Sequence, residues 1–254
     1  MLTSDRHRRI LELLEQGGSV TLPALRAVLP VTGMTLWRDL AALEAQGRLR
    51  RVRGGAVRTD RAVEPAFGQK ARRALEHKRG IAAKAAALFA GDGDVLILEG
   101  GTTVAELLPC LKAARLTVLT NSLPILARAN AGHRHLALHA SGGMLSPVSG
   151  NFVGPEAVAF FKRRRARTFF MSATGLDPAT GRLTDPNPVE IEVKRAMAAA
   201  AARVVLLLDA GKLGVVSAEE VLPLRSVDVI ITDRRITPAQ RRQLGMLGPK
   251  ILVA

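Results

Sequence analysis

The stretch VLILEGGTTVAELL, residues 95–108, predicts how the larger part of this chain folds. Its first residues are apolar on both faces, as in a strand buried inside a sheet, and the residues from Thr102 onward can form a helix. Between them stands Glu99-Gly100-Gly101. Backbone N–H groups at such a strand-to-helix turn can bind an anion, and glycines let it approach closely. A plain glycine turn with a threonine cap explains the same residues equally well, so both interpretations stay open.

Apolar runs of this kind alternate with segments that can be helical over the rest of the chain. Runs that are apolar on both faces and alternate with helices predict a largely parallel sheet covered by helices on both sides. The expected strands are 95–99, 116–120, 135–139, 167–171, 204–209, 228–232 and 251–254, and the expected helices are 76–90, 102–112, 123–131, 155–163, 188–201 and 238–247.

Polar residues follow several of the predicted strands. Asn121 and Ser122 end the second strand, Gly143 follows the third, and Asp209 and Lys212 follow a later one. Because the carboxyl ends of parallel strands meet at one sheet edge, these groups are expected to converge on a ligand crevice. Lys212 is a suitable cation for a phosphate, although a surface lysine after a strand is also common.

No cofactor or metal is expected. The glycine turn is neither a Walker A loop nor G-x-G-x-x-G, so ATP or a dinucleotide is not indicated. Cys110 is the only cysteine, which excludes an internal disulfide and a cysteine metal cluster. His133, His135 and His139 could suggest metal ligands, but the residues between the last two favour a strand, and structural or surface histidines are the simpler interpretation.

The first 57 residues predict three short helices followed by a small hairpin. Apolar residues recur at helical spacing in 4–16 and 22–29, and Thr32 can cap a third helix that carries Leu36, Leu40 and Leu43 on one face. Two short extended pieces around a glycine turn then form a wing. This order is typical of a winged helix-turn-helix, in which the third helix enters the major groove of DNA.

The outward residues of this predicted reader are suited to DNA. Thr35 and Arg38 project from the start of the third helix, and Arg38 can bond guanine or hold a phosphate. In the wing, arginines stand beside a double glycine. An ordinary helical hairpin with solvated arginines is the alternative. The DNA-binding candidates are Thr32, Thr35, Trp37, Arg38, Arg50, Arg51, Arg53, Gly54 and Gly55.

The run VTGMTLWRDLAALEAQGRLRRVRGGAV, residues 31–57, resembles the DeoR family signature, a capped helix reading T-I-R-R-D-L-x-x-L-E-x-x-G before a His-Gly-Gly-Ala wing. Trp37 replaces the first arginine of that signature, and Arg53 replaces the wing histidine. An indole can contact DNA through its N–H group or by stacking, or it can pack inward, and both possibilities stay open.

The larger half resembles the sensor domain of the same family. The resemblance implies the fold of sugar-phosphate isomerases and coenzyme A transferases, with phosphorylated sugars or related metabolites as effectors. Matching stretches are EGGTT (99–103, where the family has Asp in place of Glu99), TVLTNS (117–122), SGGM (141–144), SGNFVG (149–154), TGLDPATGRLT (174–184), EIEVKRAM (190–197) and LLLDAGKLG (206–214). The implied phosphate ligands are Gly101, Thr102, Thr103 and Lys212, and the implied sugar contacts are Asn121, Gly143 and Asp177 or Glu190.

Composition is consistent with a DNA-binding part joined to an effector-binding part. The net charge is +15, which favours a polyanionic partner such as DNA. The excess does not locate the contact, because residues 1–60 carry 10 Lys and Arg against 6 Asp and Glu, and the remainder carries 27 against 16. No apolar run approaches the roughly 20 residues that span a bilayer, and the first residues lack the order of a secretory signal. We therefore expect a cytoplasmic protein with no membrane partner.

These observations predict an N-terminal winged helix-turn-helix domain (1–57), a linker (58–75) and a C-terminal α/β effector-sensing domain (76–254). The expected function is a repressor that binds operator DNA as a homo-oligomer and responds to a phosphorylated small molecule. One rival is a sugar-phosphate isomerase-like enzyme with an added DNA-binding domain. Glu99, Asp177 or Asp209 could serve as its base, but no paired constellation stands out. Another rival is a nucleoid-type DNA binder with a degenerate sensor.

Overall fold

The computed structural model describes residues 2–17, 19–45, 48–52, 54–57 and 67–254. The predicted contact Arg53 and residues 58–66 of the predicted linker lie outside this part. The chain divides into two compact units, Met1–Glu64 and Pro65–Ala254, and the apolar core of the first is separate from those of the second. No helix in the described ranges is both long and apolar enough to cross a bilayer.

The first unit is a winged helix-turn-helix, as predicted. Its helices are α1 (Thr3–Gly17), α2 (Leu22–Val28) and α3 (Gly33–Ala45). Its strands β1 (Ser19–Thr21), β2 (Arg50–Val52) and β3 (Gly55–Val57) form an antiparallel sheet in the order β1-β3-β2. The strand β1 was not expected from the sequence. The side chain of Thr21 accepts a hydrogen bond from the Ala24 N–H and so caps α2.

The core of the first unit fixes which side of α3 faces outward. Leu36, Leu40 and Leu43 are fully buried, as their spacing predicts. They pack with apolar residues from the other helices and the sheet: Ile10, Leu14, Val20, Leu25, Leu29, Leu49 and Ala56. The opposite side of α3 is therefore free to meet a partner.

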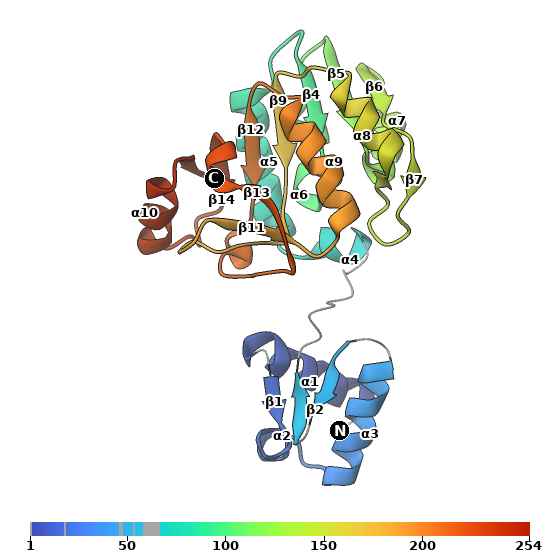
Figure 1. Ribbon diagram of the computed structural model, residues 1–254, viewed down its shortest axis with the longest axis vertical. Coiled ribbons are helices and arrows are strands. Elements are labelled where there is room, and N and C mark those ends of the chain that lie inside the picture. Colours follow the sequence, from blue (N-terminus) through green and yellow to red (C-terminus); the bar gives the residue numbers. More distant parts are fainter. Residues whose placement is uncertain (1, 18, 46–47, 53, 58–66) are drawn as a thin grey trace. The chain divides into compact units, whose positions relative to one another are not determined.

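The second unit is built on a seven-stranded parallel sheet (Figure 1). Its order is β15-β14-β12-β9-β4-β5-β6, and every neighbouring pair is parallel. All seven predicted strands are confirmed, at β4 (Val95–Leu98), β5 (Leu116–Thr120), β6 (Leu136–Ala140), β9 (Thr168–Met171), β12 (Val204–Leu207), β14 (Val229–Thr232) and β15 (Lys250–Val253).

Helices cover both faces of this sheet, each over its own apolar core. On one face the core includes buried residues of α8 (Pro155–Lys162), α9 (Pro188–Ala199) and α10 (Pro238–Met246). On the other it includes residues of α5 (Leu75–Phe89), α6 (Thr102–Ala105) and α7 (Leu123–Gly132). A further helix, α4 (Phe67–Arg72), precedes α5. The predicted helix 102–112 was too long, because α6 ends after one turn and a 3-10 turn, η1 (Leu108–Cys110), follows.

A second, antiparallel sheet was not predicted. It consists of β10 (Gly175–Leu176), β11 (Arg182–Asp185) and β13 (Glu219–Pro223) in the order β10-β11-β13. A separate hairpin joins β7 (Met144–Leu145) to β8 (Phe152–Val153). The 3-10 turns η2 (Ala210–Lys212) and η3 (Leu224–Ser226) complete the unit. The sequences of β11 (RLTD) and β13 (EEVLP) lack the continuous apolar run by which the parallel strands were recognised, and β7, β8 and β10 have only two residues each.

Candidate functional site

The outward side of α3 presents the residues predicted to read DNA. Arg38 and Thr32 are exposed, and Thr35 is partly buried. The Thr32 hydroxyl accepts a hydrogen bond from the Thr35 N–H at 3.3 Å and lies 3.0 Å from the Thr35 hydroxyl, so it caps α3 as predicted. No ion pair or hydrogen bond joins the Arg38 guanidinium to another described residue. Its side chain can therefore reach a base edge or a phosphate.

The residue after Arg38 fixes the orientation of the helix. Asp39 is 4% exposed and accepts hydrogen bonds from Arg6 Nε at 2.7 Å and Arg6 Nη2 at 3.0 Å. The Nε2 atom of His7 lies 3.2 Å from the same carboxylate. These contacts tie α1 to α3, so Asp39 positions the recognition helix and does not itself face a partner.

Trp37 and the wing pack against one another. The indole is partly buried against the core, and the Arg51 guanidinium lies 5.9 Å from its ring centroid. Arg51 also donates to Glu44 through Nε at 2.6 Å. This geometry gives Trp37 a packing role, while a DNA contact by its exposed part stays a prediction. In the turn of the wing, Gly54 has φ +87°, and a Cβ on Gly55 would lie 2.1 Å from the Val20 carbonyl oxygen.

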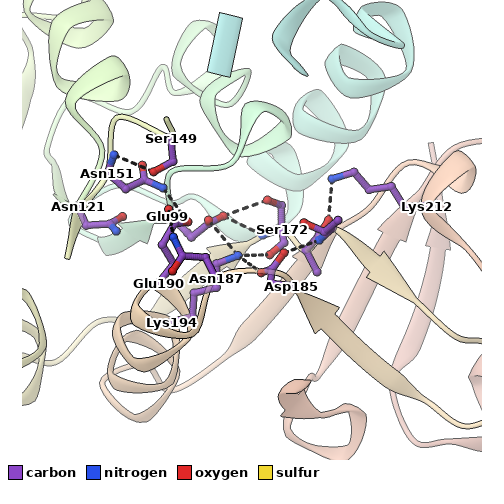
Figure 2. A network of polar contacts seen from close by, with 12 residues as sticks. Glu99, Asn121, Ser149, Asn151, Ser172, Asp185, Asn187, Glu190, Lys194 and Lys212 are labelled. Atoms are coloured by element: carbon purple, nitrogen blue, oxygen red, sulfur yellow. Dashed lines mark hydrogen bonds and ion pairs between the residues drawn. The ribbon is translucent and has the colours of Figure 1, made fainter. Parts of the chain in front are cut away.

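In the second unit, a network of buried polar side chains lies where the parallel strands end (Figure 2). Glu99 follows β4 and is 3% exposed. It accepts hydrogen bonds from the Ser172 N–H at 3.1 Å and the Ser172 hydroxyl at 3.0 Å. Its other oxygen pairs with Lys194 Nζ at 3.2 Å. Glu99 is therefore fully engaged inside the protein and is poorly placed to act as a general base.

Lys194 lies at the centre of this network. It projects from α9, is 5% exposed, pairs with Asp185 as well as Glu99, and donates to the Ser172 carbonyl oxygen at 3.1 Å. Burial opposes its charge, but the two carboxylates outweigh burial and raise the pKa of Lys194 above its ordinary value. The same ammonium group lowers the pKa of Asp185 despite burial. This cluster holds the ends of β4 and β9 against α9 and β11.

The turn after β4 has polar groups without internal partners. A Cβ on Gly100 would lie 1.7 Å from Asn151 Oδ1, and one on Gly101 would lie 2.0 Å from the Ser172 hydroxyl, so only glycine fits. The Thr103 hydroxyl is fully buried and has no hydrogen-bond partner among the described residues. The backbone N–H groups of Gly101, Thr102 and Thr103 donate no hydrogen bond to any described residue. Donors that are buried without partners suggest a site for a ligand.

Two asparagines extend this set of unsatisfied groups. Asn121 and Asn151 are 3% and 2% exposed, and the Oδ1 atom of each is buried without a partner in the described ranges. The side-chain nitrogen of Asn121 donates to the Phe152 carbonyl oxygen at 3.1 Å, and that of Asn151 donates to Glu190 Oε2 at 3.4 Å. The carbonyl oxygens could accept hydrogen bonds from ligand hydroxyls. Ser122 instead caps α7, because its hydroxyl accepts from the Ile125 N–H at 3.4 Å.

Lys212 and Lys78 lie near the turn, and Lys78 was missed in the sequence. Lys212 donates to the Ala173 carbonyl at 2.7 Å, next to Ser172. Lys78 on α5 is 3% exposed and donates to the backbone carbonyl of Lys70 on α4. Burial and the nearby charge of Lys212 lower the pKa of Lys78 to about 8. Burial, with Lys70 and Lys194 nearby, also lowers the pKa of Lys212. The carboxylate of Asp209 opposes both shifts without cancelling them, and the remaining excess of positive charge favours an anion.

The structure brings together most of the predicted effector contacts, leaves Asp177 apart, and places Gly143 against Val153, the residue that follows the carbonyl contacted by Asn121. In the view of Figure 2, Asn121 lies to one side of Glu99 and Lys212 to the other, and Glu190 lies nearby on α9. Gly143 is exposed, with φ +103°, in the turn before β7. Asp177 accepts from the Ala179 N–H at 2.9 Å and the Thr180 hydroxyl at 2.7 Å. Its carboxylate thus closes the turn between β10 and β11 and does not join the network.

The histidines show no metal site. His135 lies 3.0 Å through Nε2 from the Leu111 carbonyl oxygen, and His139 stands on β6. No group of three or more His, Cys, Asp or Glu side chains in the described residues could hold a metal ion.

Comparison with known families assigns both units. Residues 73–234 match the model described as the DeoR C terminal sensor domain, which is more than half of the chain. Residues 6–62 match the DeoR-like helix-turn-helix domain. The chain belongs to the DeoR family.

Full-length relatives in the DeoR family are named as regulators. The chain is 33% identical to the HTH-type transcriptional regulator GlpR of Haloferax volcanii, over 99% of this chain and 98% of that protein. It is 30% identical to the HTH-type transcriptional regulator GolR of Listeria innocua, over the whole of both chains. A solved ribose 5-phosphate isomerase from Plasmodium falciparum is similar only weakly, with a TM-score of 0.38 and 14% identity over 54% of this chain and 52% of that one.

Proposed function

We propose that this DeoR-family chain is a transcriptional repressor whose affinity for operator DNA is controlled by a phosphorylated small molecule bound in the second unit. Family membership supplies the general class, a helix-turn-helix joined to a sensor. The observation that carries the finer proposal is the combination of unpartnered donors at residues 100–103 with Lys78 and Lys212 near them. A group with two negative charges and several acceptor oxygens is complementary to both features.

The energetics favour a charged ligand over a neutral one. Lys78 is buried and Lys212 is partly buried, and burial together with neighbouring lysines lowers the pKa of each, so keeping both lysines charged costs free energy. A phosphoryl group removes that cost, whereas a neutral sugar does not. The carbonyl oxygens of Asn121 and Asn151 would then accept hydrogen bonds from the hydroxyl groups of the same ligand. A site with cations for a phosphoryl group and acceptors for hydroxyl groups is complementary to a sugar phosphate.

Control of DNA binding requires that the ligand favour one arrangement of the protein. A coupling of about 1–3 kcal/mol, typical of allosteric proteins, would change operator affinity roughly 5- to 150-fold. The operator contacts in this proposal are the exposed residues of α3 and the wing, with Arg38 as the base-reading candidate. A repressor would release its operator when the effector binds.

The test is thermal unfolding of the full chain with a panel of sugar phosphates, the matching unphosphorylated sugars and inorganic sulfate. A true effector at about 100 times its Kd should stabilise the chain by about 2.7 kcal/mol. Lys212→Met should remove this stabilisation, whereas Lys112→Met should retain it, because Lys112 is exposed. The stabilising compound should also change affinity for DNA selected by the chain from a random duplex library. If no phosphorylated compound does either, the proposal is wrong.

A further inference from the structure

One large apolar side chain lies among the polar residues at the start of α3. Met34 is the second residue of this helix and is 66% exposed, whereas Leu36 and Leu40 are fully buried. Met34 does not belong to the apolar core formed by the described residues of the first unit. The fold of this unit therefore does not require an apolar residue at position 34.

Met34 lies one helical turn before Arg38. Residues four positions apart share one face of an α-helix, so both side chains project from the exposed side of α3. One turn advances about 5.4 Å, which corresponds to about one to two base-pair steps of about 3.4 Å. When Arg38 contacts one base pair in the major groove, Met34 therefore faces a base pair one or two steps away.

The residues on either side of Met34 leave its side chain open. Thr35 is partly buried, and its hydroxyl lies 3.0 Å from the Thr32 hydroxyl within the cap of α3. Gly33 has no side chain, and a Cβ there would meet no described atom within 4 Å. Its φ lies outside the left-handed region, so neither packing nor backbone conformation requires this glycine. The start of α3 can therefore approach a base edge closely with Met34 in front.

The chemistry of a methionine side chain favours one base. In the major groove every base edge presents hydrogen-bond donors or acceptors, and thymine alone adds an apolar group, its C5-methyl. A thioether is flexible and polarisable and forms only weak hydrogen bonds, so it gains most by packing on that methyl group. A guanine or cytosine at the same place would lose the hydration of its polar edge without gaining a partner.

We propose that Met34 recognises a thymine in the operator by packing on its C5-methyl group, one or two base pairs from the pair contacted by Arg38. The DNA site preferred by this chain would then combine a hydrogen-bonded base with a methyl-bearing base at a fixed spacing. This inference rests on the proposed DNA contact of α3 and is independent of the effector in the second unit.

Replacement of thymine by deoxyuridine tests the proposal, because deoxyuridine pairs with adenine but lacks the methyl group. The duplex is one that the wild-type full chain selects from a random library, with each thymine replaced in turn. One such replacement should weaken binding by the wild-type chain about fourfold, the effect of one buried methyl-sized group. The Met34→Ala variant should bind both duplexes equally well. The matched control Met246→Ala, at a position 78% exposed on α10, should keep the wild-type difference.

The outcomes separate this inference from the proposed function. If the selected duplex binds but no replacement by deoxyuridine weakens it, the inference is wrong and DNA binding stands. The same conclusion follows if Met34→Ala loses as much affinity on replacement as the wild-type chain does. If the chain selects no duplex at all, both the inference and the proposed function are wrong. Met34→Ala should melt at the wild-type temperature, because the side chain is exposed.

A change of base preference gives a second readout. The Met34→Gln variant has a side chain of nearly the same length that ends in an amide, and such an amide can bond N6 and N7 of adenine. Selection with this variant should replace the thymine by adenine at the same position and retain the base contacted by Arg38. Retention of the thymine by Met34→Gln would also overturn the proposal.

Discussion

The two units of this protein present their functional side chains in opposite ways. In the first unit Thr32, Arg38 and Arg51 are exposed. In the second unit Thr103 and Lys194, like the other network residues Glu99 and Asn121, are no more than 5% exposed. The DNA-binding unit exposes its functional side chains on a surface supported by a core of leucines. The second unit buries its functional side chains where the parallel strands end.

This difference follows from the size of the two partners. DNA is large and meets a protein surface, so the contacting arginines stay hydrated until they bind and contribute little to folding. A small effector must be surrounded, so its ligands lose their hydration when the protein folds. Polar groups that are buried in this way are either paired inside the protein, as Lys194 is, or left for a ligand, as we propose for the Thr103 hydroxyl. Substitutions in the reader should therefore affect binding alone, and those in the sensor should affect stability as well.

The largest expected effect is that of Lys194→Met. It removes the ammonium group that pairs with Asp185 and Glu99 and leaves two buried carboxylates close together. Breaking a buried ion cluster from one side costs about 3–5 kcal/mol, and we expect a loss of that size in denaturant unfolding of the second unit. Glu192→Met, on the exposed side of the same helix, should change stability by less than about 0.5 kcal/mol. Equal stability of the two variants would show that the network does not hold the strand ends together.

The core of this network could be located from the sequence only in part. The glycine turn at 100–101 and the polar residues after the strands were predicted, because strand periodicity fixes which ends meet. Asp185 was not, because its strand β11 (RLTD) is not the continuous apolar run by which the parallel strands were recognised. Lys78 was also missed, although Ile81 and Ala82 lie three and four positions after it on the buried side of α5. A lysine on the apolar side of a helix was the signal that could have revealed it.

The reader was more predictable from its sequence than the sensor. Leucine spacing along α3 alone determined that Arg38 points outward, since one helix and one core decide that orientation. Contacts in the sensor depend on elements that are far apart in the chain, such as Glu99 with Lys194, and no local pattern encodes them. Asp177 illustrates the limit: the family resemblance implied a sugar contact by Asp177 or Glu190, but the Asp177 carboxylate accepts hydrogen bonds within its own turn.

An intermediate effect is expected for Arg38→Ala. Loss of a bidentate base contact should weaken specific DNA binding by about 1–3 kcal/mol in a gel-shift titration with selected operator DNA, enough to abolish the specific band at working concentrations. The melting temperature should not change, because the side chain is exposed. Arg9→Ala on α1, which removes only the pair with Glu12, is the control for lost surface charge. Equal losses for both variants would mean that α3 does not read bases.

The smallest effect expected is a pH dependence of stability and of anion binding in the second unit, which the DNA-binding unit should lack. The pKa of Lys78 is about 8, below its value in an unfolded chain, so the free protein loses this proton between about pH 7 and pH 9. In that window the unfolded state binds more protons than the folded state, so the free energy of unfolding should increase as pH rises.

An anion next to Lys78 favours the charged form of this lysine, so anion binding is accompanied by uptake of a proton. The affinity for the anion should therefore decrease, up to about tenfold, over the same pH range. Sulfate, which remains a dianion throughout, is a suitable probe in calorimetric titrations. The slope should become shallower in Lys78→Met and stay unchanged in Lys112→Met, while Lys212, whose pKa is also lowered, supplies the remainder. A slope as steep in Lys78→Met as in the wild-type chain would place the anion away from Lys78, and the contrast between an exposed DNA-binding surface and a buried effector site would then no longer rest on this lysine.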